Sequence, residues 1–557
     1  MKFSFFRFLG ILLLVFAVLF ASCQQTDQTK ESDPVETAAP GKYQLNANGE
    51  AIVNDVDFTN RKDVNDANLV FYEIFVGSFS DSNGDGIGDL RGIINRFDYL
   101  NDGNPESGTS LGVEGIWLTP IFTSSSYHKY NVNNYYEVDP SFGTMEDLKE
   151  LIALCHERGV KLILDLVINH TGTRNEWYQN FIVAQRALDE KDPYFDFYSY
   201  YVGGTSAPAG RTFSQLSGTN VYYECNFSGD MPELNFDNEL VREKVLEVAK
   251  YYLDLGIDGF RFDAAKYIYY TDHEKSVDFW KWYIGELKKI KSDVYTVAEV
   301  WDGDTITDKY YPALNCFDFT VSQASGLIAT AAKGGSAGQY TSYVENYLKT
   351  VRALRADATI VPFVTNHDMD RAAGFLVETN GQAKIGANLY LLGPGSPFIY
   401  YGEELGMRGS RGGAATDANR RLAMVWGDGD TVADPTGSTY KASNQTTETM
   451  VKQIGRDSSL FTYYKRLIMI RKANPEIARG DYQALTFNDL KLGGFTSTYD
   501  GKTVAVLHNT TASAITIDLS TIPALSGMKL REFIGEGEAV LNGTSLTIEG
   551  KTSVVLR

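Results

Sequence analysis

From Asn68 onward, short apolar runs alternate with amphipathic helical stretches. A clear helical stretch follows Asn238, where Val241, Val245 and Val248 recur on one face. The apolar runs have the length and composition of buried strands. Eight such strands are predicted, at Val70–Val76, Gly115–Leu118, Lys161–Ile168, Gly259–Asp263, Tyr295–Val300, Phe317–Val321, Ile360–Thr365 and Phe398–Tyr401.

Eight strands that are each followed by helical sequence predict an α/β fold, a (β/α)8 TIM barrel, with a doubly wound open sheet as the alternative. A segment rich in Tyr, Gly and Ser interrupts the alternation after the third strand, and the helical pattern stops near residue 478. Short strands then predict a C-terminal antiparallel β domain. The predicted organisation is a signal peptide (1–22), a flexible tether (23–67), a first barrel part (68–170), an inserted domain (171–236), a second barrel part (237–477) and a C-terminal β-sandwich domain (478–557).

The N-terminus has the pattern of an export signal. Lys2 and Arg7 precede an uncharged run of 15 residues, Phe8–Ser22, which is short for a membrane span of about 20 residues. Small residues before Cys23 resemble a bacterial lipoprotein cleavage box. We therefore expect lipidation of Cys23 and an exported lipoprotein anchored at the envelope or surface of a bacterial cell, with an ordinary cleaved signal as the alternative.

Composition narrows the possible partners. The 557 residues carry 51 basic and 71 acidic side chains, a net charge of −20, which argues against nucleic acid and against a polybasic membrane surface. Aromatic residues make up 13% of the chain, and aromatic faces suit stacking on sugar rings. Cys155, Cys225 and Cys316 are odd in number and form no CxxC pair, so no full disulfide framework, zinc site or redox site is expected.

Ionisable residues gather where the predicted strands end. Asp263, Glu299 and Asp368 each close a strand or follow it directly, and the carboxyl ends of barrel strands meet at one mouth. Carboxylates that share a cavity must separate their pKa values, because like charges at close range cannot all stay ionised. One acid and one anionic nucleophile are what retaining glycoside hydrolysis requires.

Four of these segments, in this order, resemble the signature regions of the α-amylase family, glycoside hydrolase family 13. They are Asp165–His170, Gly259–Lys266, Ala298–Trp301 and Val364–Asp368. The resemblance extends to Met231-Pro-Glu-Leu-Asn235 in the insertion and to Ile399–Glu404 at strand eight. The Met-Pro-x-Leu-Asn form is similar to lipoprotein α-amylases intermediate between oligo-1,6-glucosidases and neopullulanases.

The resemblance implies a role for each matched residue. Asp263 would be the nucleophile, Glu299 the general acid/base, and Asp368 the carboxylate that binds sugar hydroxyls. Substrate-binding roles would fall to Tyr130, His170, Arg261, Lys266 and His367. The chain departs from the family at Asn131 and Asn134, where two acids are usual, and at Tyr267, where His is frequent.

A second pattern follows the first strand. Oxygen ligands at Asp81, Asn83, Asp85 and Asp89, with a backbone carbonyl at Ile87, resemble the start of an EF-hand loop and the loop of calcium-binding family members. We expect Ca²⁺ there, with a metal-free Asx-turn loop as the alternative.

These observations predict a secreted, lipid-anchored α-amylase that hydrolyses α-1,4 bonds of starch-like glucans with retention. Its partners would be α-glucan polysaccharides or oligosaccharides, with the membrane contacted only through the lipid and no nucleic acid. The alternatives are an oligo-1,6-glucosidase, α-glucosidase or transglycosylase on the same scaffold, and a non-catalytic glucan-binding lipoprotein.

Overall fold

The computed structural model describes residues 66–104 and 107–557. The predicted signal peptide, Cys23 and almost all of the predicted tether lie outside the described residues. Within the described part of the chain, no helix has the length and apolar character needed to cross a membrane. Cys155, Cys225 and Cys316 are buried and free.

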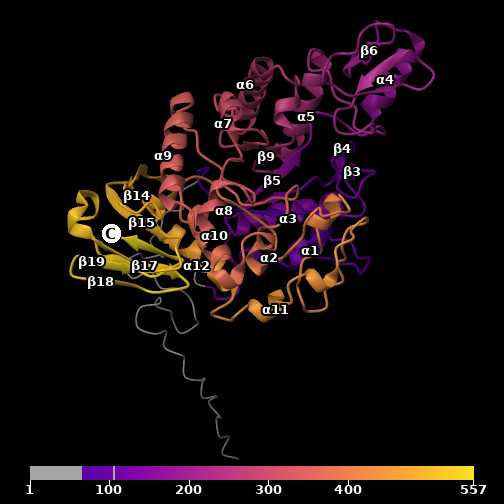
Figure 1. Cartoon of the computed structure of the whole chain (residues 1–557). Helices are drawn as coiled ribbons and strands as arrows, with labels where there is room; N and C mark the ends of the chain where they lie inside the picture. Colours follow the sequence, from indigo (N-terminus) through magenta and orange to yellow (C-terminus); the bar gives the residue numbers. More distant parts are fainter. Residues whose placement is uncertain (1–65, 105–106) are drawn as a thin grey trace, which may run out of the picture. The chain divides into compact units, whose positions relative to one another are not determined.

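A curled parallel sheet lies at the centre of the fold, surrounded by helices (Figure 1). Its strands follow the predicted runs, although most of them end one or two residues earlier. In spatial order they are β11 (Asn315–Cys316), β10 (Tyr295–Ala298), β9 (Gly259–Phe262), β5 (Lys161–Leu166), β2 (Gly115–Leu118), β1 (Phe71–Ile74) and β12 (Phe398–Tyr400).

The strand predicted at Ile360–Thr365 closes the barrel through single bridges instead of a continuous ladder. Val361 pairs with Phe317, and Phe363 pairs with Phe398. Pro362 between them has no N–H to donate, which explains the interrupted pairing. The arrangement agrees with the predicted (β/α)8 barrel.

The prediction of a strand at Phe317–Val321 is wrong in its position. The strand lies earlier, at Asn315–Cys316, and only Phe317 adds a bridge. Asp318 turns the chain, because its carboxylate accepts hydrogen bonds from the backbone N–H groups of Thr320 (3.1 Å) and Val321 (3.4 Å).

Helices cover the outside of the sheet, and side chains cap several of them. Helix α3 (Met145–Glu157) begins with a capping box between Thr144 and Asp147, and α5 (Glu239–Leu255) is capped by Asn238. The other helices are α1 (Leu90–Asn95), α2 (Phe97–Leu100), α4 (Glu176–Ala187), α6 (His273–Ile290), α7 (Asp304–Thr307), α8 (Leu327–Ala332), α9 (Ala337–Leu354), α10 (Gln382–Leu391), α11 (Met450–Gln453), α12 (Leu460–Ala473) and α13 (Pro475–Arg479).

Large side chains fill the interior of the barrel and form a floor for the polar mouth. They come from alternate positions of neighbouring strands, so they meet in layers. This floor comprises Leu69, Phe71, Trp117, Ile163, Tyr295, Val297, Phe317, Val361, Phe363, Met369 and Phe398.

Smaller strands follow β2 and β5. The pair β3 (Phe122–Ser124) and β4 (Val132–Val138) precedes α3. After β5 come α4 and a three-stranded antiparallel sheet, which consists of β6 (Tyr200–Val202), β8 (Val221–Glu224) and β7 (Phe213–Gln215). This sheet lies in the predicted insertion. After the sheet, an antiparallel bridge between His170 and Glu233 joins the end of the insertion to the segment that follows β5.

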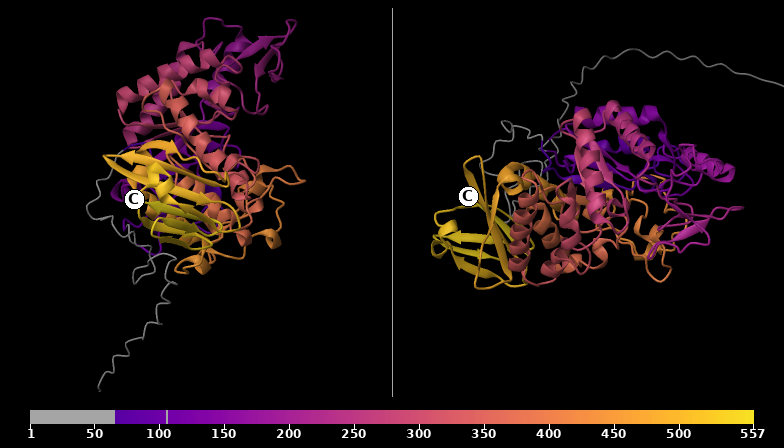
Figure 2. Two further views of the ribbon diagram at one scale, coloured as in Figure 1. Left: turned by 60° about the vertical axis from the view of Figure 1, so that its left-hand side comes forward. Right: turned by 90° about the horizontal axis from the view of Figure 1, so that it is seen from above.

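The C-terminal strands form two antiparallel sheets around their own core, as Figure 2 shows in yellow. One sheet has the order β13 (Asp481–Ala484), β14 (Leu492–Tyr499), β15 (Lys502–Asn509), β20 (Thr552–Leu556) and β17 (Leu530–Gly535). The other has the order β16 (Ile515–Asp518), β19 (Ser545–Ile548) and β18 (Ala539–Asn542). Helices α9 and α10 contact the larger sheet, so the C-terminal strands pack on the barrel helices.

Candidate active site

Arg261, at the end of β9, is the centre of the polar mouth. Its side chain is 1% exposed, and its guanidinium lies 5.1 Å from the ring centroid of Trp117 in the floor. Nη1 bonds to Asp263 Oδ1 at 2.7 Å and to Asp165 Oδ1 at 2.8 Å, and Nη2 lies 3.0 Å from Glu299 Oε2. A single cation therefore joins three carboxylates from three adjacent strands.

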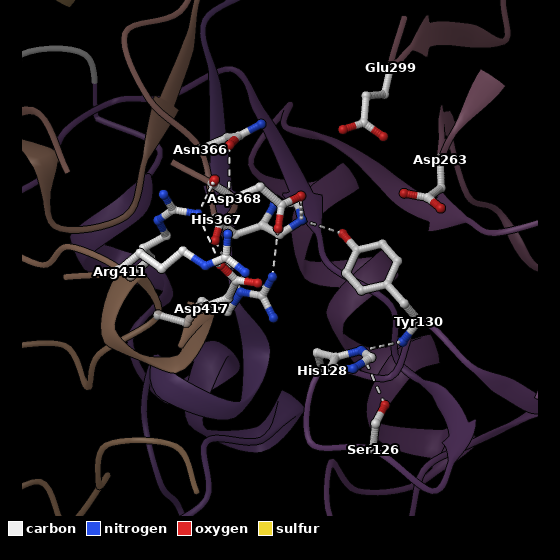
Figure 3. Close-up of polar contacts among 12 residues, drawn as sticks. Ser126, His128, Tyr130, Asp263, Glu299, Asn366, His367, Asp368, Arg411 and Asp417 are labelled. Carbon is white, nitrogen blue, oxygen red and sulfur yellow. Dashed lines mark hydrogen bonds and ion pairs between the residues drawn. The ribbon is translucent and has the colours of Figure 1, made fainter. Parts of the chain in front are cut away.

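Two of the predicted catalytic carboxylates face each other across this cation. Figure 3 shows the side chains of Asp263 and Glu299 turned toward the same space, with Tyr130 and His367 alongside. Burial raises the pKa of both carboxyl groups, and the charge of Arg261 opposes the rise in each. Glu299 also accepts a hydrogen bond from Ala264 N at 3.1 Å, which fixes its orientation.

Asp368 has the opposite electrostatic balance. Burial works against its ionisation, but His367 and Arg421 outweigh burial and hold its pKa well below the ordinary range. His367 Nε2 lies 3.0 Å from Asp368 Oδ2, and Arg421 Nη2 lies 2.6 Å from Oδ1. Its side chain is 30% exposed, so this firmly ionised carboxylate is open to a ligand. The pKa of Asp368 is thus lowered, whereas burial raises the pKa of both Asp263 and Glu299.

Tyr130 connects the two halves of the site. Its hydroxyl donates to Asp165 Oδ2 at 2.8 Å and lies 2.7 Å from His367 Nε2. The ring of Tyr130 stacks on that of His367, with centroids 5.4 Å apart. These contacts hold one aromatic face in a fixed position beside the carboxylates.

His170 and Lys266 lie at the edges of this group. His170 Nε2 is 3.2 Å from the carbonyl oxygen of Tyr130, and burial lowers the pKa of His170 to about 4, so the ring is neutral at pH 7. Lys266 Nζ donates to Trp301 O at 2.7 Å and to Asp302 Oδ2 at 3.1 Å. Lys266, in the turn after β9, therefore contacts the loop that follows Glu299 and has no bond to the three carboxylates.

Sequence patterns assign no role to three residues that the structure adds to the site. Asp165 shares Arg261 with the nucleophile candidate, and burial raises the pKa of Asp165 to about 7 although Arg261 opposes the rise. Glu73 in β1 contacts His367, and Arg421 contacts Asp368 from 53 residues further along the chain. Asp165 begins a recognisable motif, whereas Glu73 and Arg421 carry no sequence signal of this kind.

The predicted metal residues form a separate loop after β1. Asp81 and Asp85 accept hydrogen bonds from backbone N–H groups of the loop, and Asp89 caps α1 through Gly92 N. Among the described residues, no three or more His, Cys, Asp or Glu side chains are grouped to hold a metal ion. Asn83, Asp85 and Ile87 are nevertheless exposed and supply oxygen atoms, the donor type that Ca²⁺ prefers.

Comparisons with known proteins agree with this geometry. Residues 73–480 match the family model described as the alpha amylase catalytic domain. Alpha-amylase 3 of Dictyoglomus thermophilum is 35% identical over 79% of this chain and 84% of its own. An oligo-1,6-glucosidase of Bacillus cereus is 30% identical over 81% of this chain and 91% of its own.

A solved structure is similar as well. The crystal structure of an alpha-amylase from H. orenii covers 88% of this chain and 99% of its own, with 33% identity and a TM-score of 0.75. The chain therefore belongs to the α-amylase family, glycoside hydrolase family 13, and is a glycoside hydrolase that acts on α-glucans.

Proposed function

We propose that this protein is an α-amylase that hydrolyses internal α-1,4 bonds of starch-like glucans by a retaining double displacement. One observation carries the proposal: a buried guanidinium holds Asp263 and Glu299 on its two terminal nitrogens, at 2.7 and 3.0 Å. Retaining enzymes require two carboxyl groups about 5–5.5 Å apart, and carboxylates on neighbouring nitrogens of one guanidinium are held close together.

The proposed roles are those that the family resemblance implies, and the contacts of each carboxyl group are compatible with its role. Burial raises the pKa of Asp263, but its direct bond to Arg261 favours the anionic form, in which it would attack the anomeric carbon. Glu299, raised in pKa by burial, would donate its proton to the departing glycosidic oxygen. Asp368 would bind hydroxyl groups of the distorted sugar, because it is firmly ionised and partly exposed. Water would then hydrolyse the glycosyl–Asp263 ester with Glu299 as the base.

The stereochemistry of the product tests this proposal. Two displacements at one carbon give net retention, so the α-anomer should be released first from an α-1,4 glucan. Proton NMR in the first minutes, before mutarotation, distinguishes the anomers. Initial release of the β-anomer would indicate a single water-mediated displacement and would remove the nucleophile role from Asp263.

The type of glycosidic bond that the enzyme cleaves distinguishes the proposed α-amylase from the alternative activities. Relatives of this chain carry the names alpha-amylase and oligo-1,6-glucosidase, so the scaffold admits both. We expect internal cleavage of soluble starch and little release from isomaltose. Preferential isomaltose hydrolysis would assign an oligo-1,6-glucosidase, and oligosaccharide elongation would assign a transglycosylase. Binding of glucan without formation of any product would indicate a non-catalytic binding protein.

We also propose that the Asp81–Asp89 loop holds Ca²⁺. Asp81, Asn83 and Asp85, with the carbonyl of Ile87, would supply the ligands, and Asp89 would hold the loop to α1. The ion would stabilise the loop and take no part in bond cleavage. Thr431 Oγ1 donates to Asp81 Oδ2 at 2.7 Å, so the ion would also strengthen the contact between this loop and the segment near Thr431.

For location, we propose an exported lipoprotein that is tethered through Cys23. The charged start, the apolar run and the small residues before the cysteine support this proposal. Metabolic labelling with a radioactive fatty acid should mark the wild-type protein and leave Cys23→Ser unlabelled. Equal labelling of both proteins would exclude Cys23 as the lipidated residue.

A further inference from the structure

Glu73, a buried carboxylate beneath the site, has no part in the reaction described above. Glu73 lies in β1 and is 1% exposed. Its Oε1 atom is 2.6 Å from His367 Nδ1 and 3.3 Å from His367 N. The side chain of His367 is 0% exposed, so water does not compete for this contact.

The second ring nitrogen of His367 also faces a carboxylate. Nε2 lies 3.0 Å from Asp368 Oδ2 and 2.7 Å from the hydroxyl oxygen of Tyr130. That hydroxyl already donates to Asp165, so it presents a lone pair to the ring. A neutral imidazole carries one N–H and would direct a lone pair at one of the two carboxylates, whereas an imidazolium donates from both nitrogens.

We propose that Glu73 is a positioning residue that keeps His367 in its imidazolium form, and that this charge in turn fixes Asp368 for sugar binding. The inference rests on the proposed function, since it assigns Asp368 to the substrate. The carboxylate of Glu73, in β1, would thus influence the reaction through His367.

Several charged groups surround Glu73 and His367, and their combined electrostatic effect favours the imidazolium form of His367. Although burial disfavours a charged ring, Asp368 and Glu73 raise the pKa of His367 to about 10. Arg421 contributes an opposing charge, and its Nε donates to His367 O at 3.0 Å. The other titratable or charged groups that face the pair are Tyr130, Asp165, Arg261, Asp263 and Tyr400.

Loss of the Glu73 charge should disturb both partners of Nε2. A neutral His367 that donates from Nδ1 would present a lone pair at Nε2. The Tyr130 hydroxyl would then donate to His367 and release Asp165. Asp368 would lose its donor and retain only Arg421, so sugar binding and turnover should both weaken.

The experiment uses the full-length protein with ¹⁵N-labelled histidine. NMR at about pH 8.5, two units above the ordinary histidine pKa of about 6.5, reports the protonation of both ring nitrogens. His367→Asn identifies the signal. We expect an imidazolium in the wild type and a neutral ring in Glu73→Gln, which keeps a side-chain acceptor but not the charge. A neutral His367 in the wild type, or an imidazolium in Glu73→Gln, would overturn the inference.

A kinetic readout follows the same variants. In Glu73→Gln, the alkaline limb of the kcat/KM profile should shift to lower pH by about one unit or more. At pH values above the shifted limb, kcat/KM should be about tenfold lower than in the wild type. Glu73→Asp keeps the charge and should largely restore the wild-type limb. Glu404→Gln is the matched control, because Glu404 is equally buried but bonds to Tyr72 and Tyr99.

If the alkaline limb does not shift in Glu73→Gln, or shifts equally in Glu404→Gln, Glu73 has only a structural role. If Glu73→Gln does not fold, the wild-type spectrum alone decides the state of His367. The NMR measurement needs no substrate, so its result is independent of whether the enzyme cleaves α-1,4 bonds.

Discussion

Among single side chains, Arg261 determines what the carboxylates of the site can do. It is 1% exposed and contacts Asp165, Asp263 and Glu299, so its charge compensates groups that burial alone would protonate. Removal of a buried cation leaves its anionic partners uncompensated, which is strongly destabilising. The two catalytic carboxylates are therefore better tested by replacements that keep their shape.

We expect Asp263→Asn and Glu299→Gln each to lower kcat by about a thousandfold or more, which is about 4 kcal/mol in the barrier. The amide side chains can still bond to Arg261, so melting temperatures should stay within a few degrees of the wild type. Initial rates on soluble starch measure the effect. Asp278→Asn, at an exposed carboxylate of α6, is the control and should keep full activity. More than a few per cent of residual activity in either site variant, with contamination excluded, contradicts the assignment.

At the scale of elements, the loop after β1 offers a test that separates a calcium site from an Asx turn. Asp85 Oδ1 accepts a hydrogen bond from Ile87 N at 2.8 Å. Asp85→Asn keeps that acceptor and removes the charge that would bind Ca²⁺. Chelation should lower the melting temperature of the wild type and have little effect on Asp85→Asn. Equal melting curves with and without chelator in the wild type would favour a metal-free loop.

A second element-scale contact joins the β3–β4 hairpin to the insertion. Asn131 Nδ2 donates to Asp230 Oδ2 at 3.0 Å and to Ser125 Oγ at 2.9 Å. An aspartate at this position would place two carboxylates together, which the amide of Asn131 avoids.

We expect Asn131→Asp to destabilise the protein by about 1–3 kcal/mol, because Asp230 loses its donor and faces a like charge. Asp230→Asn should recover much of that loss in the double variant, since it removes the repulsion. Chemical unfolding of the four proteins gives the coupling energy. Additive effects of the two substitutions would show that this contact does not hold the hairpin to the insertion.

Comparison of the predicted and observed strands shows what periodicity can determine. Gly115–Leu118 coincides with β2, because a short apolar run between polar residues leaves one register. The strand at Asn315–Cys316 was predicted two residues too late, because the turn at Asp318 depends on a side-chain hydrogen bond that hydrophobicity does not encode. Pro362 similarly interrupts a run that is otherwise apolar enough for a strand.

For the whole molecule, barrel closure brings the barrel's first and last strands, β1 and β12, together. The predicted grouping of Asp263, Glu299 and Asp368 follows from parallel strands alone, because their carboxyl ends share one mouth. Glu73 could not be found in this way, since a single acid in an apolar strand resembles any other buried polar residue. Its partner His367 is 294 residues away, and only the closed barrel shows their contact.

The same long-range packing gives the molecule a pH-dependent stability. His508 in β15 is fully buried, its Nδ1 atom lies 2.8 Å from Ser553 Oγ, and that oxygen accepts a hydrogen bond from Asn388 of α10. Burial lowers the pKa of His508 to about 3. Between about pH 6.5 and 3 the unfolded chain therefore binds a proton at this residue that the folded protein excludes.

Because the unfolded state binds more protons in that window, the free energy of unfolding must fall as the pH falls. The contribution of His508 approaches about 1.4 kcal/mol per pH unit, and it is fully present only above about pH 6.5. His508→Asn keeps a polar group near Ser553 but does not titrate. Unfolding by urea at several values between about pH 7 and 4 should give a shallower decline for His508→Asn than for the wild type, and parallel stabilities above pH 7. Identical slopes below pH 6 would mean that His508 protonates without unfolding and that the contact between α10 and the C-terminal sheet tolerates its charge.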